Sequence, residues 1–132
     1  MGRFISCEIN GQYEIVWKYG FGVQDSEMYR INTELGIGEY HRIRYLSNWE
    51  HEKDNDETGL GYKYLSRDEP ASDDILILNR SDVKKLQIQL KFLKNSAQLN
   101  QDKWFIAMIE STINFIIDHP EQDKFILEGE IL

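Results

Sequence analysis

The residues near the start of the chain that are best suited to chemistry are aromatic and short polar side chains that can bind a ligand. Trp17 is followed closely by Phe21, Gln24 and Asp25. An aromatic ring offers a stacking surface to a flat molecule, while amide and carboxylate groups hydrogen-bond to its hydroxyls and amides. This combination predicts recognition of a small flat molecule.

A nucleotide-like ligand needs three kinds of side chain, and the sequence has candidates for each. Aromatic or apolar faces hold the base, hydrogen-bonding groups hold the riboses, and cations hold the phosphates. The candidate ligand-binding residues are Trp17, Phe21, Gln24, Asp25, Met28, Arg42, Arg44, Trp104 and Asn114. Further candidates for the same roles are Phe105, Arg30 and Arg80. For the aromatic residues, packing in the core is the competing interpretation.

Asn114 is notable because it stands within an otherwise apolar helical stretch. An amide in such a place needs a hydrogen-bonding partner, which a neighbouring backbone or a ligand can supply. The alternative is a polar stripe that faces solvent, formed with Ala107, Glu110 and Ser111. Both interpretations stay open at this point.

Catalytic and metal sites have weaker support. Cys7 lies in a predicted strand with no base beside it, and no serine sits in a Gly-x-Ser-x-Gly turn. The stretch from Asp54 to Gly59 resembles part of a calcium loop, but Leu65 stands where the bidentate glutamate is needed. The histidines are isolated from one another. The sequence therefore predicts a binding protein without metal or cofactor, and no enzyme.

Composition narrows the class further. A chain of 132 residues with 41% hydrophobic content is expected to be a single domain with a core of its own. The net charge of −8 disfavours nucleic acid as a partner. A lone cysteine excludes an intramolecular disulfide, and no apolar run approaches the roughly 18 residues of a membrane span. We therefore expect a cytoplasmic protein that binds neither membrane nor nucleic acid.

The pattern of apolar residues predicts an α+β fold. Asn10-Gly11 between two β-rich runs predicts a hairpin with a type I′ turn. The sheet is expected to be antiparallel, with roughly four to six strands, because the connections are short. The expected strands after the hairpin are 41–47, 59–65 and 75–78, with 27–31 as a short strand or irregular segment and 125–127 as an edge strand. This β-rich part, 1–80, precedes a helical part, 81–119, and a tail, 120–132.

Two helices are expected to cover the sheet. The first begins at Ser81 or Asp82, whose side chain is expected to accept a backbone N–H bond. Its sheet-facing positions recur at spacings of three and four: Val83, Leu86, Leu90, Leu93 and Ala97. Ile88 and Phe92 lie on the opposite side, and the second helix, after Asn100 or Asp102, is apolar nearly all round. Both features predict a homo-oligomer, at least a dimer.

The first thirty residues also carry a family resemblance. Met1-Gly2-Arg3-Phe4 with Ser6, then Trp17, then the run 21–26 (Phe-Gly-Val-Gln-Asp-Ser) resemble the N-terminus of anti-Thoeris sponge proteins of phages. The resemblance implies an oligomer in the host bacterial cytoplasm that sequesters a cyclic ADP-ribose signal without degrading it. It implies that ligand contacts include Trp17, Asp25, Met28, Trp104 and Asn114, and it leaves the phosphate-binding arginine unassigned.

Two other functions remain open at the level of sequence. The chain is compatible with a phage inhibitor that binds a host defence protein directly, because its acidic blocks can mimic nucleic acid. It is also compatible with a small hydrolase or lyase that acts on a nucleotide signal. The two differ from a sponge in a simple respect: the inhibitor needs no small ligand, and the enzyme consumes it.

The acidic segment 48–58 is predicted to be an exposed loop that folding does not need. It has no hydrophobic period and carries five Asp/Glu side chains. Replacing it with a short Gly/Ser linker should change the melting temperature by only a few degrees. A collapse of the fold in thermal unfolding would instead show that Trp49 is a core anchor.

Overall fold

The computed structural model describes residues 3–19, 27–47, 61–66, 68–96 and 102–130. The acidic segment 48–58 and the predicted ligand residues Phe21, Gln24 and Asp25 lie outside these ranges, as does Ala97. The helices and strands are β1 (Arg3–Ile9), β2 (Gln12–Tyr19), α1 (Glu27–Leu35), β3 (Glu39–Tyr45), β4 (Tyr62–Leu65), β5 (Asp73–Asn79), α3 (Asp82–Lys94), α4 (Lys103–Ile117) and β6 (Lys124–Glu130).

The described strands form one six-stranded sheet in the order β2-β1-β6-β5-β3-β4. Every neighbouring pair is antiparallel. The predicted α+β class is therefore confirmed, with two helices in the C-terminal part of the chain. The predicted type I′ hairpin is also confirmed, because Asn10 and Gly11 have φ angles of 52° and 82° and Ile9 pairs with Gln12.

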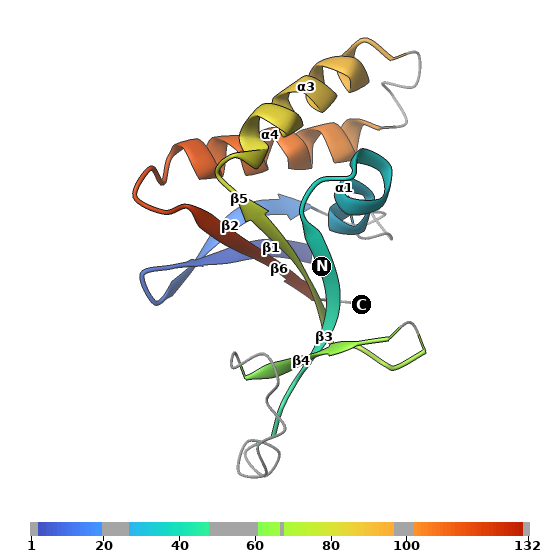
Figure 1. Cartoon of the computed structure of the whole chain (residues 1–132), viewed down its shortest axis with the longest axis vertical. Coiled ribbons are helices and arrows are strands. Elements are labelled where there is room, and N and C mark those ends of the chain that lie inside the picture. The colour runs from blue at the N-terminus through green and yellow to red at the C-terminus, as the bar shows by residue number, and fades with distance from the viewer. Residues whose placement is uncertain (1–2, 20–26, 48–60, 67, 97–101, 131–132) are drawn as a thin grey trace.

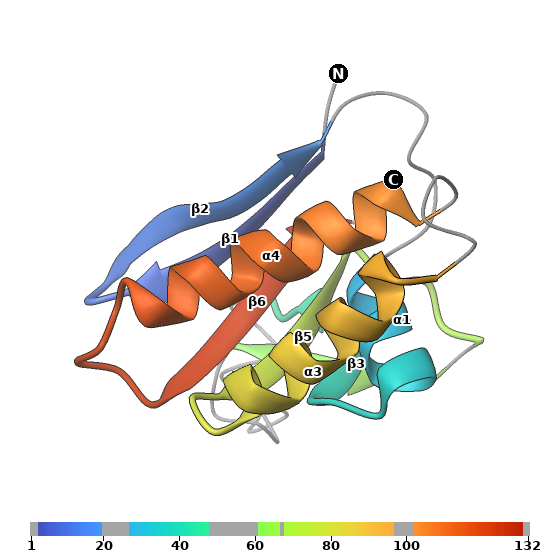
Figure 2. The same cartoon turned by 90° about the horizontal axis from the view of Figure 1, so that it is seen from above.

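The helices that the structure describes lie on one side of the sheet. Figure 1 shows α3 and α4 above the strands, and Figure 2 shows these two helices side by side with α1 next to α3. The core forms between the helices and this side of the sheet, from fully buried residues such as Leu86, Ile109 and Phe125. The opposite side of the sheet carries no described helix, and we call it the open face.

The segment predicted as a short strand or irregular stretch, 27–31, is wrong in its element type. It forms the first turns of α1. Met28, Ile31 and Leu35 follow helical spacing, and the first two are fully buried in the core. The helix is only nine residues long, so its apolar period repeats too few times to stand out against the flanking polar residues.

The prediction of an edge strand at Phe125–Leu127 is also wrong. β6 is an interior strand, paired with β1 on one side and with β5 on the other. Phe125 and Leu127 are fully buried against the helices, while Ile126 between them belongs to the open face. Antiparallel pairing between distant segments depends on the whole sheet, and a local pattern cannot specify the neighbours of a strand.

Both C-terminal helices begin where expected, while α3 ends at Lys94, before the expected helical position Ala97. The expected capping bond does not form. Ser81 occupies the N-cap of α3 without a side-chain bond to the helix. The carboxylate of Asp82 instead accepts the backbone N–H of Asn79 at 2.8 Å, on the strand side of the turn. Asp82 therefore stabilises the connection from β5 into α3 and leaves the first turn of the helix uncapped by a side chain.

Gly38 should be far less tolerant of a side chain than its neighbour Gly36. A Cβ atom at Gly38 would lie 2.8 Å from Leu78 Cδ2 and 2.9 Å from the Ile77 carbonyl oxygen, whereas at Gly36 nothing lies within 4 Å. Both residues have positive φ angles, 77° and 66°. Gly38→Ala should lower the free energy of unfolding by about 2–4 kcal/mol, and Gly36→Ala by about 1 kcal/mol. Denaturant unfolding measures both, and equal losses would contradict the close packing at Gly38.

Candidate functional site

The open face carries a row of aromatic side chains on two neighbouring strands. The sequence predicts that His41, Ile43 and Tyr45 point to one face of their strand, and this is confirmed. The His41 ring stacks on Tyr64 at a centroid distance of 3.6 Å, and Tyr45 meets Tyr62 edge to face at 5.7 Å. Ile43 packs beneath them with Tyr62 and Ile75. This apolar cluster on the open face therefore supports the row of aromatic side chains.

A cavity of about 290 Å³ opens on this face. Its walls come from the first hairpin, from β3 and β4, and from β6 with the turn before it. The lining residues are Glu8, Asn10, Tyr13, Tyr45, Tyr62, Gln122, Lys124, Ile126 and Glu128. Segments from both ends and the middle of the chain thus meet here, which happens because β6 lies between β1 and β5.

A short hydrogen bond in the cavity joins Tyr45 and Glu128. The Tyr45 hydroxyl donates a hydrogen bond to Glu128 Oε1, with an oxygen–oxygen distance of 2.6 Å. Burial and the neighbouring Glu128 carboxylate both raise the pKa of Tyr45. Tyr45 therefore stays a neutral donor, and its hydrogen bond orients the carboxylate on the cavity wall.

Glu128 itself sits in an unfavourable place for a negative charge. Burial raises the pKa of its carboxyl group, the hydrogen bond from Tyr45 opposes the rise, and repulsion from Asp73, Asp74 and Glu8 adds to it. A carboxyl group with a raised pKa in a cavity is typical of a functional site. It accepts hydrogen bonds when ionised and donates one when protonated.

The charge of the cavity determines which ligands fit. Among the described lining residues, Glu8 and Glu128 bring negative charge and Lys124 brings positive charge. The tyrosine rings supply apolar faces and hydroxyls, and Asn10 with Gln122 supplies amide groups. The arrangement suits a molecule that offers a flat ring together with hydroxyl or N–H donors, because carboxylates only accept hydrogen bonds from such groups.

The ligand residues that the sequence proposes are dispersed. Trp17 and Met28, at 8% and 0% exposure, are buried in the core on the helix-covered side. Trp104 is 46% exposed on α4, and Asn114 is exposed on the same helix. Phe105 is buried. None of these residues lines the cavity on the open face.

The position of Asn114 agrees with a helix side that faces solvent. Its neighbour on the predicted polar stripe, Glu110, forms an ion pair with Lys94 of α3 at 2.7 Å. Thr112, in contrast, is buried, and its hydroxyl donates to the carbonyl of Met108. The buried polar group of α4 is thus satisfied within the helix, and Asn114 needs no buried partner.

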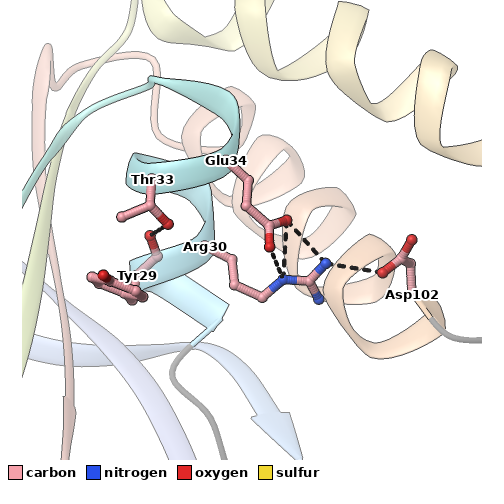
Figure 3. Close-up of polar contacts among 5 residues, drawn as sticks. All are labelled: Tyr29, Arg30, Thr33, Glu34 and Asp102. Carbon is pink, nitrogen blue, oxygen red and sulfur yellow. Dashed lines mark hydrogen bonds and ion pairs between the residues drawn. The ribbon is translucent and has the colours of Figure 1, made fainter.

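The candidate arginines have structural partners within the chain. Arg30 of α1 donates to Asp102 at 2.9 Å and to Glu34, as Figure 3 shows, and its guanidinium lies 4.0 Å from the centre of the Phe105 ring. Arg80 donates to the carbonyl oxygens of Ile116, His119 and Gln122. Arg30 links α1 to the start of α4, and Arg80 binds carbonyl oxygens at the end of α4. A phosphate would have to compete with these internal hydrogen bonds.

Arg42 and Arg44 lie on the side of β3 opposite Ile43. Arg42 donates to the carbonyl oxygen of Ser66 at 3.1 Å, and both arginine side chains are partly buried. The cavity opens on the other side of this strand, so neither arginine lines it. Arg42 and Arg44 therefore do not supply the cavity with a cation for a phosphate group.

Cys7 is unsuited to a reactive role. It lies in β1, as the sequence predicts for a strand residue, and its side chain is 1% exposed. Burial raises the pKa of the thiol to about 11, so the nucleophilic thiolate is scarce at neutral pH. The described residues also contain no group of three or more His, Cys, Asp or Glu side chains that could hold a metal ion.

Sequence reasoning missed Tyr13, Tyr45, Tyr62 and Glu128 as site residues. The tyrosines were a usable signal, because alternation places Tyr62 and Tyr64 on one face of their strand, and the β3–β4 register then brings Tyr45 beside Tyr62. Glu128 had no such signal, since its strand was expected at an edge.

Comparison with known proteins found no matching family model, no matching curated protein and no matching solved structure. In the described part of the chain, no helix is long and apolar enough to span a membrane.

Replacing Glu128 by Gln should flatten the pH dependence of stability. The folded-state pKa is raised, so the stabilising contribution of the protonated group is fully present below the unfolded pKa of about 4.3 and is lost as pH rises through the folded value. The melting temperature of Glu128→Gln should therefore rise relative to that of the parent protein as the pH increases above the unfolded pKa of about 4.3.

Thermal unfolding across this pH range measures the effect, and Glu121→Gln on the exposed turn before β6 is the control. Parallel curves for the parent and Glu128→Gln would contradict the raised pKa.

Proposed function

We propose that this protein binds a small nucleoside-type molecule in the cavity on the open face and releases it unchanged. The observation that carries the proposal is the Tyr45–Glu128 hydrogen bond inside a cavity with two further tyrosines on its wall. Preoriented acceptors beside aromatic rings are the usual elements of sites that bind a base and a ribose. The volume, about 290 Å³, is near the lower end of such sites.

Each part of the ligand has a counterpart in the cavity. The rings of Tyr13, Tyr45 and Tyr62 offer faces and edges to a planar base. The carboxylates of Glu8 and Glu128 accept hydrogen bonds from ribose hydroxyls, and this interaction relieves the repulsion that raises the pKa of Glu128. The amides of Asn10 and Gln122 can bind the edges of the base.

The sponge resemblance narrows the proposal to an immune-evasion protein that sequesters a cyclic ADP-ribose isomer. A cyclic ADP-ribose isomer carries phosphates, which the two cavity glutamates repel. Its phosphates must then lie at Lys124, at the hairpin end of the cavity. The nucleoside part of the proposal rests on the cavity, and the cyclic ADP-ribose part rests on the N-terminal residues.

One observation favours an enzyme as a second candidate. Glu128, with its raised pKa, and the Tyr45 hydroxyl form a pair that can exchange a proton with a bound ligand. Such a pair fits the hydrolase or lyase that the sequence left open. Recovery of the ligand decides between the two functions, because a binding protein returns the molecule it received.

The sponge resemblance also implies self-association, and this homo-oligomer stays a prediction. The sequence placed it on Ile88 and Phe92, which are exposed on α3 in the single chain at 56% and 68%. Neither residue lines the open-face cavity, so ligand binding in the proposed site does not depend on a second copy.

Calorimetric titration should detect binding of adenosine or a cyclic ADP-ribose isomer, and the loss of one tyrosine should weaken it. Tyr45→Ala removes a ring and the donor to Glu128, so affinity should fall by roughly 5- to 150-fold. Tyr64→Ala is the matched control, because Tyr64 has nearly the same exposure, 40% against 42%, on the same face but does not line the cavity. Glu128→Gln should weaken binding by about tenfold or more.

The outcomes separate the possible functions. Binding of adenosine without cyclic ADP-ribose isomers would keep the site and exclude the sponge. Chromatography that shows a converted ligand would place the protein among the enzymes. No heat with any of these ligands, or equal losses in Tyr45→Ala and Tyr64→Ala, would contradict the proposed site.

A further inference from the structure

The side of α3 that faces away from the core carries two large apolar residues in exposed positions. Ile88 and Phe92 are one helical turn apart, and Phe92, at 68%, is the most exposed large apolar side chain that the structure describes. Their spacing places both on one stripe of the helix. Leu86, in contrast, is fully buried against the core, so the exposed pair is a second apolar side of the same helix.

A pocket of about 300 Å³ lies beside Ile88. Leu35 and Ile37, from the end of α1 and the turn into β3, form its apolar wall together with Ile88, and Lys85 also lines it. The pocket is large enough for one apolar side chain. It lies on the helix-covered side of the molecule and shares no lining residue with the open-face cavity.

Basic side chains surround this apolar pair. Lys84, Lys85 and Lys91 are exposed on α3, and they flank Ile88 and Phe92 on the helix surface. The segment 82–103 has five Lys/Arg against two Asp/Glu, although the whole chain has a net charge of −8. Lysines on both sides of an apolar pair make this surface complementary to an acidic partner. They repel the same basic helix of a second copy.

We infer that the exposed side of α3, with the pocket beside Ile88, docks an acidic amphipathic segment of a partner protein, which places one apolar side chain in the pocket. The lysines steer the acidic segment and fix its position, while Phe92 and Ile88 supply the apolar contact. This interaction does not depend on the ligand proposed for the open face. It uses Ile88 and Phe92, on which the sequence predicts the homo-oligomer, so the partner segment and a second copy exclude one another at this surface.

The probe is a labelled synthetic peptide of about 15 residues with Leu and Glu at amphipathic helical spacing. Fluorescence anisotropy should show binding that weakens as salt is added, since lysines contribute to it. The same peptide with Lys in place of Glu should not bind. Phe92→Ser and Ile88→Ser should each weaken binding by about tenfold. Ile15→Ser on the open face, where Ile15 is 59% exposed, is the matched control and should bind as the parent does.

Charge reversal supplies an independent readout. Lys84→Glu combined with Lys85→Glu should reverse the preference, so that the Lys peptide binds better than the Glu peptide. Equal binding of both peptides to the parent protein, or no effect of Phe92→Ser, would overturn the inference. Light scattering that shows a dimer, dissociated by Phe92→Ser, with no binding of the Glu peptide would assign this surface to a second copy instead.

Discussion

Pairing of β6 with both β1 and β5 is the interaction on which the rest of the structure depends. It joins the N-terminal hairpin to the strands from the middle of the chain and makes one sheet of them. The register Cys7↔Leu127 and Leu76↔Leu127 places three buried apolar side chains side by side under the helices. The same register puts Glu128 on the opposite side, because successive residues of a strand alternate between faces.

One-sided helical cover explains why the candidate site lies on the open face. Helices cover one side of the interior strands, so polar groups buried there must be satisfied within the protein, as Asp74 is by the Tyr40 hydroxyl. On the open face, Glu128 and Tyr45 stay partly exposed and keep a side toward the cavity. Partial burial raises the pKa of Glu128 without removing the group from a ligand's reach.

The arginines Arg30 and Arg80 form hydrogen bonds within the protein, whereas the lysines of α3 lie at its surface. Arg30 joins α1 to the start of α4, and Arg80 binds carbonyl oxygens at the end of α4 and in the turn that follows. Carbonyl groups at a helix C-terminus lack partners within the helix, so Arg80 also offsets the negative end of its dipole. The lysines of α3 remain at the surface, which gives an acidic protein one locally basic side.

Local patterns in the sequence were sufficient for the α+β class, the Asn10-Gly11 hairpin, the two C-terminal helices and the common face of His41, Ile43 and Tyr45 on their strand, because turn chemistry and hydrophobic period act over a few residues. They were insufficient for α1, whose short period is weak, and for the interior place of β6. The candidate site was missed because the interior position of β6 was missed. Trp17 and Met28 are aromatic or apolar residues that tertiary packing buries in the core. Glu8 and Glu128 lie beside the tyrosines only because β6 pairs inside the sheet. Strand order depends on contacts between distant segments, and a single sequence carries no local signal for them.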